Sequence, residues 1–124
     1  MRASERGFYN SSEPEPTMLI DIGANLSSQR FDGDITEVLQ HAQNANVEKI
    51  VITGTSIAES QAAIDLCTTH TADFPNMLHA TAGIHPHSAD QFNPKSTSMS
   101  LRRLAEHPSV VAIGETGLDF FRNL

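Results

Sequence analysis

Glu115 is the residue whose surroundings most directly predict chemistry. It follows the apolar run 110–113 and lies between Gly114 and Gly117, which leave room for a ligand close to the backbone. A carboxylate in this setting can bind a hard divalent cation or act as a base. The alternative is a solvated loop glutamate. We take Glu115 as a candidate metal ligand and catalytic residue because other polar groups accompany it.

His85 and His87 flank Pro86, two positions apart in a polar segment. Proline stiffens the loop and fixes the directions of the two rings, so the pair can share a metal ion or contact a phosphate. Two surface histidines on a turn are the alternative. We take His85 as a catalytic and substrate-binding candidate and His87 as a substrate-binding candidate.

Asp21 and Asn25 are the polar residues near the end of the first apolar run. A buried carboxylate at position 21 requires a partner, because an unpaired one would become neutral. Asp21 therefore supports a metal ion or histidine from behind, or it caps nearby backbone amides, and both interpretations stay open. Asn25 either contacts the substrate or caps a turn.

Four apolar runs and three amphipathic segments alternate along the chain and must position these residues. The runs are short and rich in β-branched residues, as in strands that are covered on both faces. Ser56, with Glu59 three positions later, predicts the capped start of the second helix. We predict strands at 18–22, 48–54, 78–83 and 110–114, and helices at 34–42, 56–72 and 98–106.

The strands recur about every thirty residues, which is the length of a βαβ unit. Right-handed helical crossovers between such strands produce a parallel sheet, so the predicted fold class is α/β. In parallel α/β folds the ligand site lies at the carboxyl ends of the strands. We therefore expect all the polar clusters to meet on one rim of the sheet.

Composition restricts the classes of function. The 124 residues are 39% hydrophobic, which is enough for one domain with a core. The net charge of −7 provides no basic field for nucleic acid, so a DNA substrate would need a metal ion or local groups to hold its phosphates. Cys67 is the single cysteine, which excludes an intrachain disulfide, and its helical setting predicts a buried structural thiol.

Residues 1–17 are polar and rich in Ser, Glu and Pro, which predicts a disordered extension before a domain at 18–124. The chain contains neither an apolar run of transmembrane length nor the apolar core of a signal peptide. We expect a cytoplasmic protein, or a nuclear one in a eukaryote.

The polar clusters, in this order, resemble the TatD family of metal-dependent deoxyribonucleases. The similar segments are Ile20–Leu26, Ile52–Thr55, Ala82–His87 and Val111–Phe120. The resemblance implies a TIM barrel that hydrolyses DNA phosphodiesters from a 3′ end with Mg²⁺ or a similar ion. It also implies that Glu115 binds the metal, that His85 contacts the scissile region or a phosphate, and that Asp119 supports the site from its loop.

The sequence departs from the family pattern in two ways. Many relatives carry Asp-x-His-x-His after the first strand, and here Gly23 and Asn25 occupy the histidine positions. A TIM barrel needs eight strands and about 250 residues, whereas the predicted strands make only its first half. We therefore expect 18–124 to be a partial barrel, inactive by itself, whose first and last strands are open apolar edges that promote association.

Two alternatives to an inactive enzyme fragment remain. The first is a non-catalytic half-barrel that binds another copy of itself or a full-length relative. The second is a small self-contained domain of flavodoxin or receiver type. Neither a Gly-x-Gly-x-x-Gly fingerprint nor a lysine after the fourth strand supports the second alternative.

Overall fold

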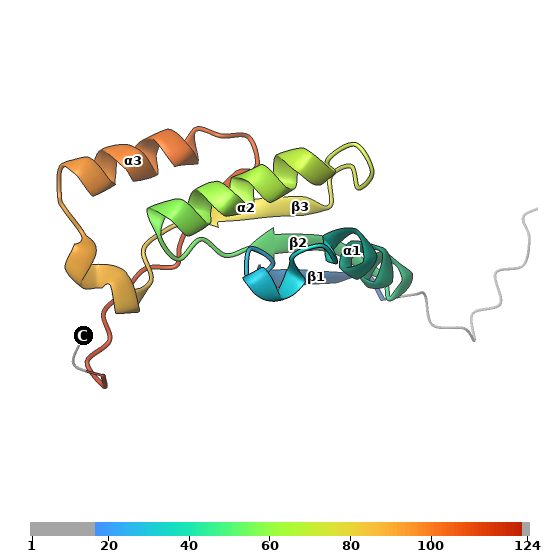
Figure 1. Ribbon diagram of the computed structural model, residues 1–124, viewed down its shortest axis with the longest axis horizontal. Coiled ribbons are helices and arrows are strands. Elements are labelled where there is room, and N and C mark those ends of the chain that lie inside the picture. Colours follow the sequence, from blue (N-terminus) through green and yellow to red (C-terminus); the bar gives the residue numbers. More distant parts are fainter. Residues whose placement is uncertain (1–16, 123–124) are drawn as a thin grey trace, which may run out of the picture.

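The computed structural model describes residues 17–122. Four strands alternate with three α-helices (Figure 1). In chain order the elements are β1 (Leu19–Ala24), α1 (Ile35–Asn44), β2 (Val47–Ile52), α2 (Ile57–His70), β3 (Leu78–Ala82), α3 (Ser96–Ala105) and β4 (Val110–Ile113). Two short 3₁₀ helices, η1 (Gln29–Phe31) and η2 (Pro86–Gln91), lie in the loops after β1 and β3. All seven predicted elements are confirmed, with ends that differ by at most two residues.

The sheet is parallel throughout and has the order β1-β2-β3-β4, so sequence neighbours are also neighbours in space. The β2–β3 pairing is regular, with Ile50 opposite Leu78 and Ile52 opposite Ala80. The two outer pairings contain register shifts. The predicted α/β class with four parallel strands is therefore confirmed.

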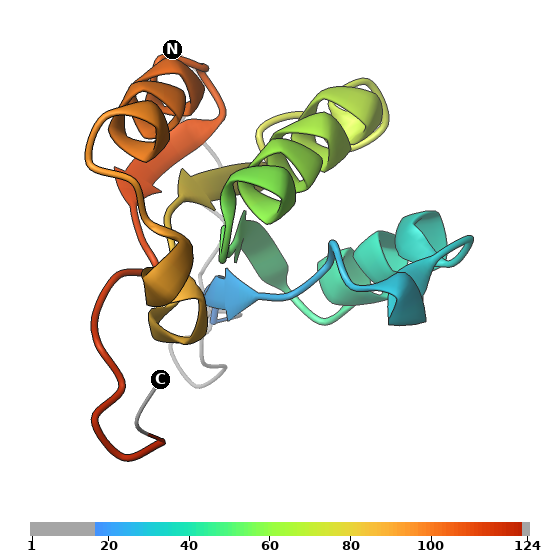
Figure 2. The same cartoon turned by 60° about the vertical axis from the view of Figure 1, so that its left-hand side comes forward.

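The three helices lie on the same side of the sheet (Figure 2), and α2 packs most extensively against β3. The buried side chains of the two central strands face these helices: Ile50 and Ile52 in β2, and Leu78, Ala80 and Ala82 in β3. They alternate with less buried residues, as expected where one face of a sheet is covered. The core therefore lies between β2, β3 and the helices.

Two asparagines make the turns into the inner strands. Asn46 precedes β2 with φ of 64°, and Asn76 lies before β3 with φ of 60°. Asparagine tolerates this left-handed region better than most residues because its short side chain can bond locally. The same turn chemistry thus delivers the chain into both central strands.

Ser56 caps α2 as predicted, because its Oγ accepts the Glu59 amide hydrogen at 3.0 Å. The reciprocal half of the capping box is not formed. The Glu59 carboxylate instead accepts a hydrogen bond from the Ser27 hydroxyl at 2.7 Å. This contact ties the loop after β1 to the first turn of α2.

The two outer strands expose apolar side chains to solvent. In and beside β1, Met18, Leu19, Ile20 and Ile22 are 59%, 50%, 54% and 80% exposed. In β4, Val111 and Ile113 are 55% and 56% exposed. The expected open apolar edges are therefore present.

The predicted extension 1–17 lies outside the described residues except for Thr17. None of the helices within 17–122 has the length and apolar character needed to cross a membrane. Cys67 is buried, as expected from its helical setting, with 1% of its surface exposed.

Candidate active site at the carboxyl ends of the strands

The strand ends meet on one rim because backbone hydrogen bonds continue past the ends of the strands. The amide of His85 donates to the carbonyl of Thr55 at 2.8 Å, and the amide of Glu115 donates to the carbonyl of Gly54 at 3.0 Å. These bonds bring the segments after β2, β3 and β4 side by side. The expectation that the polar clusters share a rim is met for these three strand ends.

Glycines allow this close approach. A Cβ at Gly83 would lie 2.2 Å from the carbonyl carbon of Gly114, and a Cβ at Gly54 would lie 2.3 Å from the carbonyl oxygen of Thr81. Both contacts are with backbone atoms, which cannot swing aside as a side chain can. The absence of a side chain at Gly83 therefore determines how near Glu115 lies to the end of β3.

Ser60 is a fully buried polar residue that also fixes this rim. Its Oγ accepts the amide hydrogen of Gly83 at 3.1 Å and so connects α2 to the end of β3. Ser60 was not among the residues predicted from the sequence. One serine in an amphipathic helix carries no signal that separates a buried hydrogen-bonding role from an ordinary helical position.

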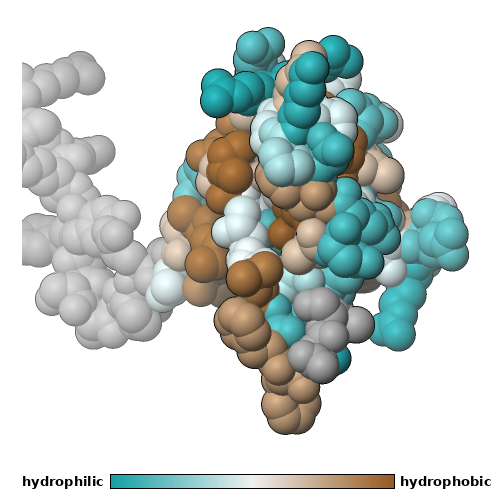
Figure 3. Space-filling model, turned by 90° about the vertical axis from the view of Figure 1, so that its left-hand side faces the viewer, coloured by the Kyte–Doolittle hydropathy of each residue, from teal (hydrophilic) through white to brown (hydrophobic). Residues whose placement is uncertain are grey.

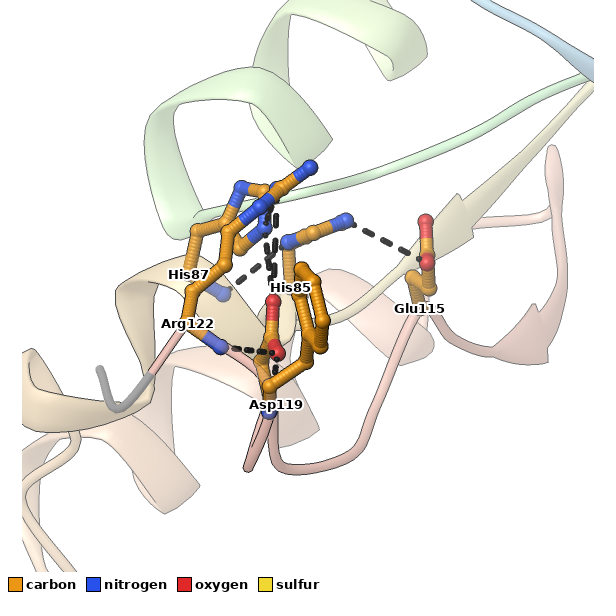
Figure 4. A network of polar contacts seen from close by, with 6 residues as sticks. His85, His87, Glu115, Asp119 and Arg122 are labelled. Carbon is orange, nitrogen blue, oxygen red and sulfur yellow. Dashed lines mark hydrogen bonds and ion pairs between the residues drawn. The ribbon is translucent and has the colours of Figure 1, made fainter.

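His85 and Glu115 face one another across the rim (Figure 4). The distance between His85 Nε2 and Glu115 Oε1 is 3.4 Å. The two side chains are 27% and 47% exposed, so the pair is open to a ligand from solvent. The structure thus brings together the two residues that the sequence ranks first.

A backbone hydrogen bond orients the His85 ring. The amide of His87 donates to His85 Nδ1 at 3.0 Å, so Nδ1 must be an unprotonated acceptor. A neutral His85 therefore carries its proton on Nε2, the nitrogen that faces Glu115. From this position Nε2–H can donate to Glu115 or to an anionic ligand between them.

His87 belongs to a second cluster, with Asp119 and Arg122. Its Nε2 lies 3.1 Å from Asp119 Oδ2 and also contacts Arg122 Nη1 (Figure 4). One ring nitrogen cannot both accept from the guanidinium and donate to the carboxylate, so the two contacts compete. The His87 ring also packs edge-on against the His85 ring, with centroids 4.3 Å apart, which links the two clusters.

Asp119 is held mainly by its own loop. Its Oδ1 accepts the amide hydrogens of Phe121 and Arg122, each at 3.0 Å. The hydrogen bond from the Arg122 amide is the largest cause that holds the Asp119 pKa below its usual value, and His87 contributes less. Asp119 is therefore a carboxylate at neutral pH. Arg122 was not predicted from the sequence, although a cation three positions after an acidic residue is a usable signal.

A cleft of about 380 Å³ opens beside the two histidines. It is lined by Thr55, Ser56, Glu59, His85, His87 and Ser88. Its walls come from the loop after β2, the first turn of α2 and η2. The cleft gives a ligand on the rim access to both rings.

Asp21 and Asn25 lie apart from these clusters. Asp21 is exposed, contrary to the expected burial, because β1 is an uncovered edge; its Oδ1 accepts the Gly23 amide hydrogen at 3.0 Å. Of the two roles left open for Asp21, this contact corresponds to the capping of a nearby backbone amide. Asn25 is also exposed, and its backbone carbonyl accepts from the Ser28 amide at 3.3 Å in a turn.

The described residues do not make a complete metal site. Within 17–122 no group of three His, Cys, Asp or Glu side chains is close enough to hold an ion. His85 and Glu115 are two adjacent donors, and a bound divalent ion needs several fixed ligands.

Curated bacterial relatives match most of the chain. It is 47% identical over 105 residues to the 3′-5′ ssDNA/RNA exonuclease TatD of Erwinia tasmaniensis, covering 85% of this chain and 39% of the relative. The protein of the same name from Pantoea vagans is 47% identical over 106 residues, with 86% and 39% coverage. The chain thus spans about two fifths of the length of these relatives.

Solved structures show the same partial correspondence. A hydrolase TatD family protein from Entamoeba histolytica superposes with a TM-score of 0.77 at 32% identity, over 85% of this chain and 39% of that one. An uncharacterized amidohydrolase from Saccharomyces cerevisiae gives 0.69 at 31% identity, over 86% and 39%. The four-stranded sheet is therefore half of a TIM barrel, as predicted.

The family model described as TatD related DNase matches residues 20–123. That range contains every helix, all of β2 to β4, β1 except its first residue, and both polar clusters of the rim. The chain belongs to the TatD related DNase family.

Proposed function

We propose that this chain supplies one half of a nuclease site that hydrolyses DNA phosphodiesters from a 3′ end and that needs a divalent metal ion. By itself the half-barrel is inactive. The observation that carries the proposal is the contact between His85 Nε2 and Glu115 Oε1, 3.4 Å apart on the carboxyl rim of a TatD half-barrel.

The ion proposed is Mg²⁺, with Glu115 as one ligand. Mg²⁺ prefers oxygen donors and is usually held by one or two carboxylates. Imidazole suits softer metals, so His85 is better matched to a phosphate oxygen than to Mg²⁺. When bound, such an ion polarises the phosphoryl group and activates a water molecule.

The other rim residues have binding and supporting roles in this proposal. His85 Nε2–H donates to a phosphate oxygen at the scissile bond, and its orientation depends on the His87 amide. His87 and Asn25 contact the DNA strand. Asp119 holds His87 in place, and Asp21 shapes the loop after β1 through the Gly23 amide.

Inactivity of the isolated chain follows from its ligand count. The described residues offer two adjacent donors, and the relatives extend well beyond the matched 39% of their length. The remaining donors would come from the strands of a second half.

We place this protein in the cytoplasm, where its substrate would be accessible without passage across a membrane.

A chimera tests the proposed role of Glu115. Residues 18–124 would replace the matching part of the Erwinia tasmaniensis exonuclease, which restores a full barrel. We expect Mg²⁺-dependent shortening of 5′-labelled single-stranded DNA from its 3′ end. Glu115→Gln in the chimera should reduce kcat more than ~100-fold. Mutation of residues that only support the metal ligands already lowers metal affinity or activity by about 10–100-fold.

Glu106→Gln is the matched control, because Glu106 is an exposed glutamate at the end of α3, away from the rim. It should leave kcat within about twofold. A folded chimera whose activity survives Glu115→Gln would contradict the proposal. If the isolated chain with Mg²⁺ shortened the DNA faster than the same reaction without metal ion, its proposed inactivity would be contradicted.

A further inference from the structure

We propose that the cleft beside the two histidines holds the 3′-terminal nucleotide of a single DNA strand, and that Glu59 recognises its free 3′-hydroxyl group. Glu59 would thereby determine that hydrolysis begins at a strand end. The inference rests on the proposed function, because it assigns the place of the terminal nucleotide within that same site.

The cleft lies directly beside the pair of residues proposed to meet the scissile phosphate. His85 lines the cleft, and Nε2 of the same ring lies 3.4 Å from Glu115 Oε1. A strand whose phosphate contacts Nε2 therefore has its next nucleotide within reach of the cleft. The walls of the cleft follow β2 and β3, and each of these strands has a paired strand on both sides. The centre of the sheet, not its edges, holds these walls in place.

The size and lining of the cleft suit one nucleotide. Its volume of about 380 Å³ is near the lower end of the roughly 300–1,000 Å³ typical of small-ligand clefts. The rings of His85 and His87 form an aromatic wall, and bases of any sequence stack on such rings. Figure 3, which looks toward the carboxyl rim, shows hydrophilic surface (teal) beside apolar surface (brown). A nucleotide, with a polar sugar and a flat base, needs both kinds of surface.

Glu59 is the acidic residue of the cleft lining, and its side chain is partly buried and held in place. Its Oε2 accepts the Ser27 hydroxyl hydrogen at 2.7 Å, and its backbone amide donates to Ser56 Oγ at 3.0 Å. The bond from Ser27 engages one carboxylate oxygen. The other oxygen, Oε1, can therefore accept a hydrogen bond from a ligand in the cleft.

A carboxylate in this place distinguishes a terminal nucleotide from an internal one. A free 3′-hydroxyl group can donate a hydrogen bond to Glu59. An internal nucleotide carries a phosphate at the same position, and like charges brought together at a binding site are strongly unfavourable. A strand that continues through the cleft is therefore disfavoured, whereas a strand that ends there is accepted.

Binding to the full 124-residue chain tests this assignment without any reaction. Thymidine trinucleotides that end in a 3′-hydroxyl, a 3′-hydrogen or a 3′-phosphate would be titrated with EDTA present, followed by amide NMR shifts. We expect the 3′-phosphate to weaken binding at least ~10-fold, with the 3′-hydrogen probe between the other two. The shifts should centre on Glu59 and Ser88, which line the cleft. Equal binding of the hydroxyl and hydrogen probes, or of the hydroxyl and phosphate probes, would overturn the proposal.

A fourth probe separates Glu59 from the general repulsion of a chain with net charge −7. It has a free 3′-hydroxyl group and a phosphate at its 5′ end, so its charge matches that of the 3′-phosphate probe. Its affinity should stay within about twofold of the unphosphorylated probe at about 0.15 M salt, which screens distant charges. A 5′-phosphate that weakens binding as much as a 3′-phosphate would overturn the role of Glu59.

Glu59→Gln removes the charge but keeps an oxygen that can accept from Ser27. The difference between the 3′-hydroxyl and 3′-phosphate probes should shrink to about twofold, the residual expected of distant charges. Glu106→Gln is the matched control, because it removes the same charge far from the cleft and should leave the difference unchanged. A uniform loss of affinity for all probes in Glu59→Gln would show a merely structural role and overturn the proposal. If this variant does not fold, the four probes decide the question on the unaltered chain.

The chimera distinguishes failure of this inference from failure of the proposed function. We expect it to shorten DNA with a 3′-phosphate at least ~10-fold more slowly than DNA with a 3′-hydroxyl group. Hydrolysis of both substrates at the same rate would overturn the role of Glu59 and leave the nuclease proposal standing. A chimera without hydrolysis, together with the expected order of binding, would support the cleft as a site for strand ends and contradict the nuclease proposal.

Discussion

The position of Glu115 depends on residues that carry no charge. The end of β3 passes so close to the Gly114–Glu115 peptide that only glycine fits at position 83. Ser60 then fixes Gly83 from the opposite side through its hydroxyl group. A buried serine and a glycine therefore determine where the carboxylate lies relative to His85.

Gly83→Ala tests this packing. The added Cβ would lie 2.2 Å from a backbone carbon, so the two strand ends must separate. We expect the free energy of unfolding to fall by ~1–3 kcal/mol, the usual cost of overpacking, in urea titrations followed by circular dichroism. Gly23→Ala is the control, because its nearest neighbour would be Thr53 Oγ1 at 3.9 Å. An equal loss in both variants would contradict the explanation.

Cys67 provides a pH-dependent prediction. Burial raises the pKa of its thiol from 9.0 to about 11, with a hydrogen bond to Ser109 acting in the opposite direction. The folded state therefore favours the protonated thiol. The contribution of this thiol to the free energy of unfolding is fully present below pH 9 and is lost as the pH rises through about 11.

The thiol should accordingly react with Ellman's reagent at pH 9 much more slowly than in urea, because the thiolate is the nucleophile and the folded chain contains little of it. Cys67→Ala should remove part of the loss of stability above pH 9. Rapid labelling of the folded chain at pH 9 would show that the group is neither buried nor perturbed as described.

At the level of elements, the loops after the strands bring the functional groups together. α2 begins at the rim with Ser56 as its N-cap, and the same turn binds the loop after β1 through Glu59 and Ser27. The start of this helix therefore serves both local structure and the shape of the cleft. A change at the cap should affect stability and the cleft together.

Ser56→Ala removes the hydroxyl that accepts the Glu59 amide hydrogen. We expect it to lower the free energy of unfolding by ~1 kcal/mol, the typical cost of losing an N-cap, as measured by urea denaturation. Ser96→Ala in the first turn of α3 is the matched control, because Ser96 is exposed and is not the N-cap residue of that helix. It should change stability by less than about 0.5 kcal/mol. A neutral Ser56→Ala would show that the cap contributes nothing to α2.

At the scale of the whole molecule, helices cover one face of the sheet, whereas the two outer strands expose apolar side chains. The core is continuous between the sheet and its three helices. The outer strands, in contrast, expose isoleucine and valine to water. A half-barrel of this kind is stabilised by whatever covers its edges.

The midpoint of thermal unfolding should therefore rise with protein concentration, because association stabilises the folded state by mass action. For two associating chains we expect a rise of roughly a few degrees for each tenfold increase in concentration, measured by scanning calorimetry. Ile113→Lys, at an exposed position of β4, should make the midpoint independent of concentration, whereas Met99→Lys, at an equally exposed position of α3, should leave the dependence unchanged. A wild-type midpoint that does not change with concentration would contradict this expectation.

Sequence alone determined the fold class, the order of the elements and the residues to inspect on the rim. Hydrophobic runs and capping residues are local signals, so strands and helices could be located within one or two residues. Parallel topology then required that Glu115 and His85 share one end of the sheet. The sequence also indicated that the first and last strands would be open edges.

Only the tertiary structure decided which rim residues touch. It paired His85 with Glu115 and His87 with Asp119, and it added Arg122 and Ser60, whose contacts are 35 and 23 residues away in the chain. It also left Asp21 exposed, although its position within an apolar run indicated burial. The physical reason is that burial and side-chain contacts depend on what lies across the fold, which periodicity along the chain does not encode.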